Sequence, residues 1–149
     1  MLEFKTPQIE DKAWVDQCFK HLKTMNCDYT FGNMFVWSTE YSTKICRFKD
    51  FFICSWGMGK EKNFGMPVGK GDFKEAVEEV IKYAKANDIM PRFYGVTEAY
   101  VEMLNENFPD AFQFLYDESY GDYIYEVEKM ASLKGKKYHG KRNHITNFK

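Results

Sequence analysis

The sequence lacks C-x-x-C pairs and long apolar runs. Its four cysteines, Cys18, Cys27, Cys46 and Cys54, are widely spaced, and a chain of this size does not need disulfides to hold a core. No apolar run approaches the roughly 20 residues of a membrane span. Residues 1–4 also lack the basic start and apolar stretch of a secretory signal. We therefore expect a cytoplasmic protein whose cysteines are reduced.

Composition favours one folded domain. The chain has 149 residues, of which 44% are hydrophobic, 18% aromatic and 29% charged. This mixture is typical of globular proteins and excludes intrinsic disorder over most of the chain. The sequence also lacks an internal repeat and a low-complexity linker. Because His139 and His144 are five residues apart, which does not place them on one helix face, we predict no metal site.

Acidic residues are missing from position 134 onward. That segment carries five lysines and Arg142, a net of +6, and subtracting it from the formal net charge of −1 leaves −7 on residues 1–133. We therefore divide the chain into a main domain, 1–133, and a basic helix, 134–149. The helix could attract phosphate, anionic lipid or nucleic acid, present a solvated face, or dock an acidic partner.

Hydrophobic periodicity and turn signals predict an alternation of strands and helices. The helix over 73–86 has the clearest apolar stripe, and Asp72 with Glu75 forms its capping pattern. Val77 and Ile81 should be fully buried in this stripe. The predicted elements are a strand at 2–4, helices at 6–23 and 31–37, a hairpin of 44–48 and 51–56, a strand at 64–68, the helix at 73–86, a strand at 90–96, a helix from 97 to before Pro109, a second hairpin of 112–116 and 122–127, and a helix at 136–148.

This order resembles a mixed α/β sheet of the acetyltransferase-like (acyl-CoA N-acyltransferase) fold, in which a Gly-rich loop leads from the fourth strand into the central helix. Four segments then narrow the resemblance. They are residues 30–33 with Trp37, residues 66–71, residues 122–125 and residues 133–143. In these segments the chain resembles the C-terminal domain of phosphatidylglycerol lysyltransferases and its uncharacterised soluble relatives.

The resemblance implies a function and partners. Members of this family carry two acetyltransferase-like halves in tandem, and this chain resembles the first half alone. Members with an assigned activity transfer an aminoacyl group from charged tRNA to a lipid. The resemblance therefore implies acyl or aminoacyl transfer, with aminoacyl-tRNA or acyl-CoA as donor in the full-length family. The implied partners are a second half or a homodimer, with tRNA or an anionic small molecule as candidate ligand.

The loop before the central helix departs from working acetyltransferases. There, backbone N–H groups hold pyrophosphate, and a Gln or Arg lies three residues before the first glycine. Here Met66 stands at that position, and the carboxylate of Asp72 competes for the helix terminus. We interpret Gly69, Lys70 and Gly71 as a degenerate donor loop or a purely structural turn. We expect no cofactor in this half, and acetyl-CoA in particular should bind poorly.

Two further groups of residues could carry chemistry. Tyrosines on a strand could protonate a leaving group and a carboxylate could orient an amine, but such residues also serve as core packing. The catalytic candidates are Asp122, Tyr123, Tyr125 and His139. The candidates for anion or substrate binding are Lys137, Lys141, Arg142 and Asn143, against the alternative of a solvated connecting helix.

The sequence thus leaves two functional hypotheses. One is half of an acyl or aminoacyl transferase that contributes a scaffold and part of an anionic-substrate cleft. The other is a non-catalytic binding or dimerisation module that has kept the fold and lost the donor loop. In either case we expect Tyr138, Ile145 and Phe148 to form an apolar helix face that promotes self-association.

Overall fold

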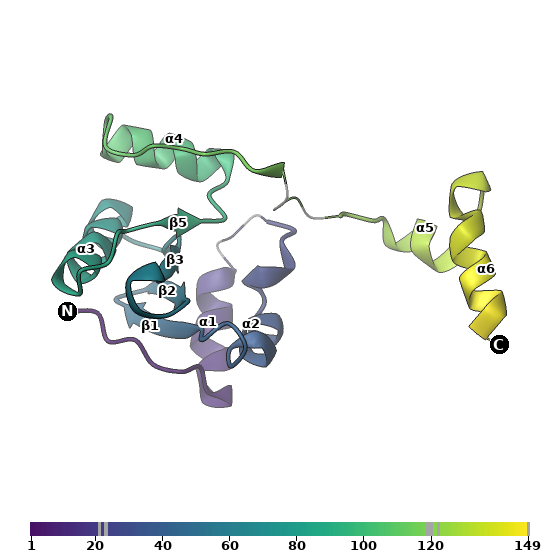
Figure 1. The fold of residues 1–149 in the computed structure, drawn as a ribbon, viewed down its shortest axis with the longest axis horizontal. Helices are drawn as coiled ribbons and strands as arrows, with labels where there is room; N and C mark the ends of the chain where they lie inside the picture. Colours follow the sequence, from purple (N-terminus) through teal and green to yellow (C-terminus); the bar gives the residue numbers. More distant parts are fainter. Residues whose placement is uncertain (21, 23, 119–120, 122, 149) are drawn as a thin grey trace. The chain divides into compact units, whose positions relative to one another are not determined.

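The computed structural model describes residues 1–20, 22, 24–118, 121 and 123–148 (Figure 1). It divides into two compact units, Met1–Asp117 and Glu118–Lys149. The division therefore follows Asp117, whereas the charge pattern suggests one after residue 133. None of the helices in the described residues has the length and apolarity of a membrane span.

A mixed five-stranded sheet forms the centre of the first unit. The first predicted hairpin is confirmed, with Phe48 opposite Phe51 at its turn. The predicted strand at 64–68 is split in two, because Pro67 has no N–H to donate to the ladder. Both pieces run antiparallel to β2, while β5 runs parallel to β3. The strands are β1 (Lys44–Phe48), β2 (Phe51–Trp56), β3 (Asn63–Gly65), β4 (Val68–Gly69) and β5 (Phe93–Tyr94).

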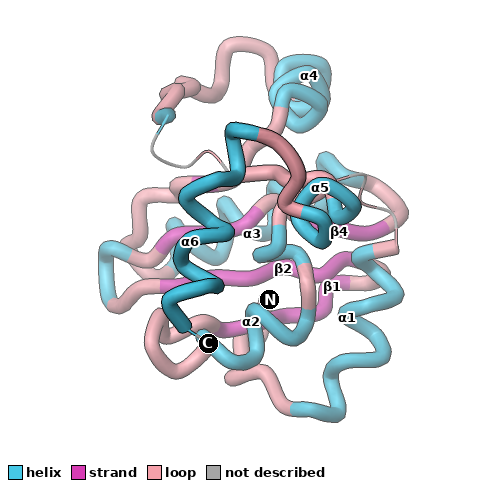
Figure 2. The backbone as a smooth tube through the Cα atoms, turned by 90° about the vertical axis from the view of Figure 1, so that its right-hand side faces the viewer, coloured by secondary structure: helices cyan, strands magenta, loops and turns pink. Residues whose placement is uncertain are grey.

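Helices cover both faces of this sheet, as the two views show (Figures 1 and 2). On one face, Val80 of α3 packs with Ile53 and Phe64. On the other, Val15 of α1 packs with Phe52, together with residues of α2. The predicted α/β class is confirmed, and the architecture is compatible with an acetyltransferase-like fold. The α-helices in the described residues of this unit are α1 (Lys12–Phe19), α2 (Phe31–Trp37), α3 (Phe73–Ala86) and α4 (Glu98–Asn107).

The helix bounds predicted from sequence periodicity agree with the structure for some helices and differ for others. The bounds of α3 and α2 agree with the predicted ranges. Within α3, Val77 is fully buried but Ile81 is only half-buried, so the prediction for Ile81 is wrong. The first helix is shorter than predicted: a 3-10 turn, η1 (Ile9–Asp11), precedes α1, which ends at Phe19.

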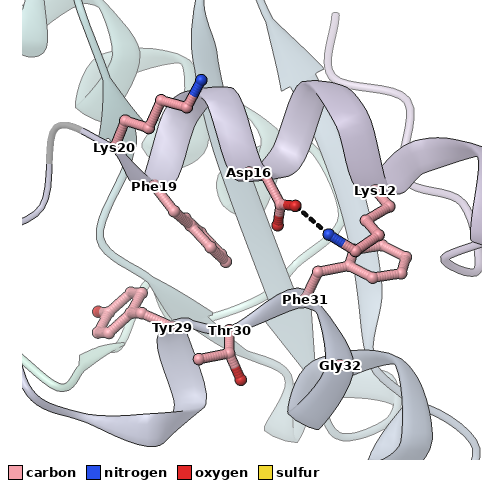
Figure 3. A pocket seen from close by; sticks show the side chains of 8 residues that line it. All are labelled: Lys12, Asp16, Phe19, Lys20, Tyr29, Thr30, Phe31 and Gly32. Atoms are coloured by element: carbon pink, nitrogen blue, oxygen red, sulfur yellow. Dashed lines mark hydrogen bonds and ion pairs between the residues drawn. The ribbon is translucent and has the colours of Figure 1, made fainter.

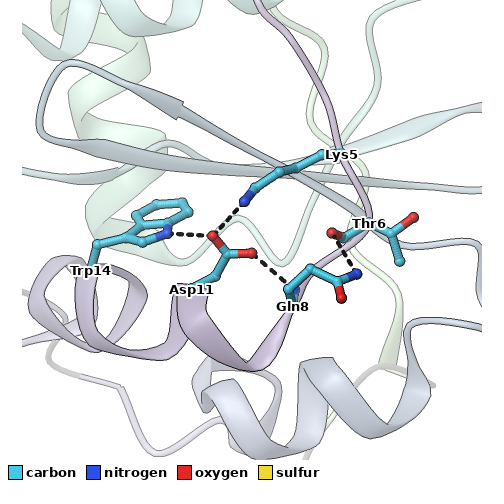
Figure 4. Close-up of polar contacts among 5 residues, drawn as sticks. All are labelled: Lys5, Thr6, Gln8, Asp11 and Trp14. Carbon is cyan, nitrogen blue, oxygen red and sulfur yellow. Dashed lines mark hydrogen bonds and ion pairs between the residues drawn. The ribbon is translucent and has the colours of Figure 1, made fainter.

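A buried carboxylate ties the N-terminal segment to α1 (Figure 4). Asp11 is 4% exposed. Its Oδ1 accepts hydrogen bonds from Lys5 Nζ at 2.6 Å and Trp14 Nε1 at 2.9 Å, and its Oδ2 accepts one from the Gln8 N–H at 2.9 Å. The predicted strand at 2–4 is reduced to a single bridge, in which Lys5 pairs with Ile45.

The second unit is helical in its later part. It contains α5 (Val127–Ser132), η5 (Lys136–Tyr138) and α6 (His139–Phe148). The predicted second hairpin is wrong, because the described residues of 112–116 and 122–127 form no strand. Tyr116 and Tyr123 are 91% and 89% exposed, so no paired strand covers them. The helix α5 was not predicted.

Candidate functional site

A cavity of about 370 Å³ lies beside the loop that joins β4 to α3. Its walls come from that loop, from the start of α4, and from the segment between α1 and α2. Its volume falls within the range typical of small-molecule sites. The lining residues are Leu22, Thr24, Tyr29, Phe51, Pro67, Val68, Gly69, Gly71, Phe73, Thr97, Ala99, Tyr100 and Met103. None of these side chains carries a formal charge.

The two glycines of the loop are required by the fold. Gly69 pairs with Phe51, and a Cβ at position 69 would lie 2.0 Å from the carbonyl oxygen of Asp50. Gly71 has a φ of 139°, a backbone conformation that favours glycine. Backbone packing therefore accounts for both glycines without a bound phosphate.

The N-terminus of α3 is already occupied by a carboxylate. Asp72 accepts a hydrogen bond from the Glu75 N–H at 3.0 Å, as the capping pattern predicts. Glu75 forms an ion pair with Lys49, so a second carboxylate lies in this first turn. Met66 is fully buried beside α3. Because the side chain of Met66 packs inside the protein and Asp72 repels anions, this terminus is poorly suited to pyrophosphate.

Two tyrosines contribute hydroxyl groups to the cavity, in addition to Thr24 and Thr97. The hydroxyl of Tyr100 donates a hydrogen bond to the carbonyl oxygen of Pro67 at 3.4 Å, and its ring stacks on Phe73 with centroids 5.9 Å apart. Burial raises the pKa of Tyr100 to about 12. Burial also raises the pKa of Tyr29, with smaller contributions from neighbouring groups led by Cys54. Both phenols therefore stay protonated at neutral pH. Sequence reasoning did not identify either tyrosine, because no short motif marks them.

A second, more open depression of about 440 Å³ lies between α1 and the start of α2 (Figure 3). Tyr29 borders this depression as well as the cavity. Its two bordering lysines have partners, since Lys12 pairs with Asp16 and Lys20 donates to Gln17. Among its described residues, the depression therefore has no uncommitted cation that could define a ligand.

The basic residues predicted to bind anions all lie in the second unit. Lys137 and Lys141 are exposed, and Lys141 Nζ lies 5.5 Å from the centroid of the Tyr125 ring. Arg142 donates from its Nη1 to the carbonyl oxygens of Leu133 and Gly135, the latter at 2.9 Å. This guanidinium therefore connects α6 to the preceding turn.

The remaining candidates have the following positions. Asn143 and His139 lie 3.3 Å apart, measured between Nδ2 and Nε2, on the exposed side of α6. Tyr123 and Tyr125 are exposed and belong to no strand. Asp122 lies outside the described residues. Gly69, Lys70 and Gly71 belong to the first unit, and Lys70 is exposed. No group of three potential metal ligands occurs among the residues that the structure describes.

Comparison with known proteins gives the family. Residues 19–149 match the family described as phosphatidylglycerol lysyltransferase, C-terminal. The chain belongs to this family. A crystal structure of a conserved protein of unknown function from Bacteroides thetaiotaomicron VPI-5482 is similar, with 33% sequence identity and a TM-score of 0.84. The match covers 99% of this chain and 50% of the Bacteroides protein, so the chain spans half the length of that protein. No curated protein matches.

Proposed function

We propose that the chain is one half of an acyl or aminoacyl transferase of this family, and that it contributes a scaffold and part of a substrate cleft. Family membership over residues 19–149 is the observation that carries the proposal. A cavity at the end of the sheet, between the β4–α3 loop and α4, supports it, because open α/β sheets bind ligands at such edges.

A separate anion-binding face is assigned to the second unit, taken by itself. Lys137 and Lys141 are exposed and four residues apart along a helical stretch, so their side chains lie on one face. Arg142 already binds two carbonyl oxygens, so we assign it a supporting role. The proposed ligand of this face is the phosphate backbone of an aminoacyl-tRNA.

Binding of charged tRNA tests this assignment. Filter binding of lysyl-tRNA should weaken when Lys137 or Lys141 is replaced by glutamate, and the salt dependence of log K should fall by about one unit for each lysine. Lys85→Glu on α3 is the matched control, since Lys85 is an exposed helical lysine of the first unit. An equal loss in the control would contradict a site on the second unit.

Transfer itself requires a separate measurement. The chain should be mixed with labelled lysyl-tRNA and vesicles of phosphatidylglycerol, and the label in the lipid fraction followed with time. The proposed partner is a second acetyltransferase-like half, for which the relative of twice the length provides support. Light scattering over a concentration series tests the alternative of a homodimer. Equal labelling of the lipid when free labelled lysine replaces the charged tRNA would refute the aminoacyl donor.

The alternative function is a non-catalytic binding or dimerisation module. Asp72 favours it, because its carboxylate holds the helix N–H that a phosphate would need. Under either function, calorimetric titration with acetyl-CoA should give a dissociation constant weaker than about 10 micromolar, which corresponds to roughly 7 kcal/mol of binding. Tighter stoichiometric binding would show that the loop still accepts pyrophosphate.

A further inference from the structure

Among the residues that the structure describes, the wall of the cavity beside the β4–α3 loop has no ionisable side chains other than its two tyrosines. Aliphatic and aromatic side chains supply most of its surface, among them Phe51, Val68 and Met103. A charged group placed in such a site would lose its hydration without gaining an opposite charge. The cavity therefore disfavours phosphate, and it equally disfavours the ammonium group of an aminoacyl chain.

Besides the hydroxyls of Thr24 and Thr97, the wall contains the hydroxyl of Tyr29, which a ligand could use. No hydrogen bond joins the Tyr29 hydroxyl to another residue that the structure describes, whereas Tyr100 is bonded to Pro67. The ring of Tyr29 is held by an edge-on contact with Phe19, at 5.9 Å between centroids. Its oxygen lies close to the backbone of Gly95, where a Cβ would be 3.5 Å away. A phenol is protonated at neutral pH and burial raises the pKa of Tyr29 further, so its hydroxyl can donate to an acceptor in the cavity.

We propose that this cavity binds an uncharged acyl group. The hydrocarbon part would lie against Phe51, Val68 and Met103, and the ester or amide carbonyl would accept a hydrogen bond from Tyr29. The inference rests on the proposed function, since it names the substrate class for the cleft of the same transferase half. It differs from the simplest expectation for a lysyltransferase, because it assigns this half to a neutral chain instead of a lysyl cation.

Binding of small neutral esters tests the proposal directly. The protein is titrated calorimetrically with methyl butanoate, methyl hexanoate and methyl octanoate, and in parallel with sodium octanoate and lysine methyl ester. Affinity for the neutral esters should rise about fourfold for each added methylene until the cavity is filled. Octanoate should bind at least about tenfold more weakly than methyl octanoate, and lysine methyl ester should not bind. An equal affinity for charged and neutral probes would overturn the proposal.

Two variants locate the binding. Tyr29→Phe removes only the hydroxyl and should lower the affinity for methyl octanoate about two- to tenfold, as expected for one hydrogen bond. Tyr41→Phe is the matched control, because Tyr41 is 57% exposed and does not line the cavity. Ala99→Leu adds bulk at an exposed position of α4 that borders the cavity, and it should shorten the longest ester that binds. Unchanged affinities in both cavity variants would place the binding elsewhere and refute the assignment.

The result can be separated from that of the transfer experiments. Ester binding with no tRNA binding and no lipid labelling would leave the neutral acyl site in place and refute the proposed function. Lipid labelling without chain-length-dependent ester binding would support the proposed function and overturn the neutral acyl site.

Discussion

Asp11→Asn should destabilise the first unit strongly near neutral pH. Asparagine has nearly the same size, but it has no charge and only one acceptor oxygen, whereas Asp11 accepts three hydrogen bonds through two oxygens. Hydrogen bonds to a charged group contribute about 1.5 to 3 kcal/mol each, and the donors regain some of this from water once released. The side chain of Lys5 is 58% exposed and rehydrates readily. We therefore expect Asp11→Asn to lower the free energy of unfolding by about 2 to 4 kcal/mol.

The loss should depend on pH in a defined direction. Burial by itself raises the pKa of Asp11, but the hydrogen bonds from Lys5, Trp14 and Gln8 and the charge of Lys5 together lower it below 3.8. A carboxylate with a lowered folded-state pKa stabilises the protein above its unfolded-state pKa and loses that effect as the pH falls through the folded-state value. The difference in free energy of unfolding between wild type and Asp11→Asn should therefore have its largest value at pH 7 and decrease below about pH 4.

Urea unfolding at a series of pH values measures this difference. Asp16→Asn is the matched control, since Asp16 lies on the same helix and pairs with Lys12 at the surface, where both side chains are partly exposed. Exposed pairs of this kind contribute about 0.3 to 0.5 kcal/mol. An Asp11→Asn variant that lost no more free energy of unfolding than the control would contradict a stabilising role of the buried carboxylate. A loss of the same size at pH 7 and pH 3 would also contradict it.

Three further outcomes are expected in the first unit. Val77→Ala should lower the free energy of unfolding measured in urea by about 2 to 3 kcal/mol, because it removes two fully buried carbons. A loss near zero would contradict the position of α3 against the sheet. Gly69→Ala should lower the free energy of unfolding by about 1 to 3 kcal/mol, since its Cβ would lie 2.0 Å from a carbonyl oxygen of the β1–β2 turn. Gly32→Ala is the control, because a Cβ there meets open space, and it should be neutral or stabilising. Equal effects of the two substitutions would contradict the close approach at Gly69. Iodoacetamide at pH 8 should label exposed Cys27 and spare Cys54, which is only partly exposed and whose pKa desolvation raises to about 12. Rapid labelling of Cys54 in the folded protein would contradict the raised pKa.

Local signals predicted those elements whose residues interact within a short stretch of chain. The bounds of α3 followed from its apolar stripe and from Asp72, and its cap has the predicted hydrogen bond. The first hairpin followed from alternation in residues 44–48, a two-residue turn and the apolar run of 51–56 that returns after it. In both cases the partner groups are close in sequence, so the pattern alone identifies them.

The candidate site depends on contacts that no local pattern encodes. Tyr29 and Tyr100 are 71 positions apart in the sequence, and only the packing of α4 against the β4–α3 loop places both around one cavity. Likewise, Gly69 resembles a phosphate-loop glycine in sequence, and its close approach to the β1–β2 turn becomes visible only in three dimensions. The sequence therefore predicted a turn before α3, and it could not predict the cavity beside that turn.

The described residues of the predicted second hairpin form no strands, but their alternating pattern still has a physical meaning. The alternation comes from apolar and aromatic residues that are costly to leave in water, and Leu115, Tyr116 and Tyr123 are at least 86% exposed. Within Glu118–Lys149, Tyr138 is the one described residue that is buried, so that unit has almost no core of its own. Units of this size seldom fold without a partner surface, a metal or disulfides. The alternation therefore indicates residues that are suited to burial, and the partner proposed for this family half is the surface that would bury them.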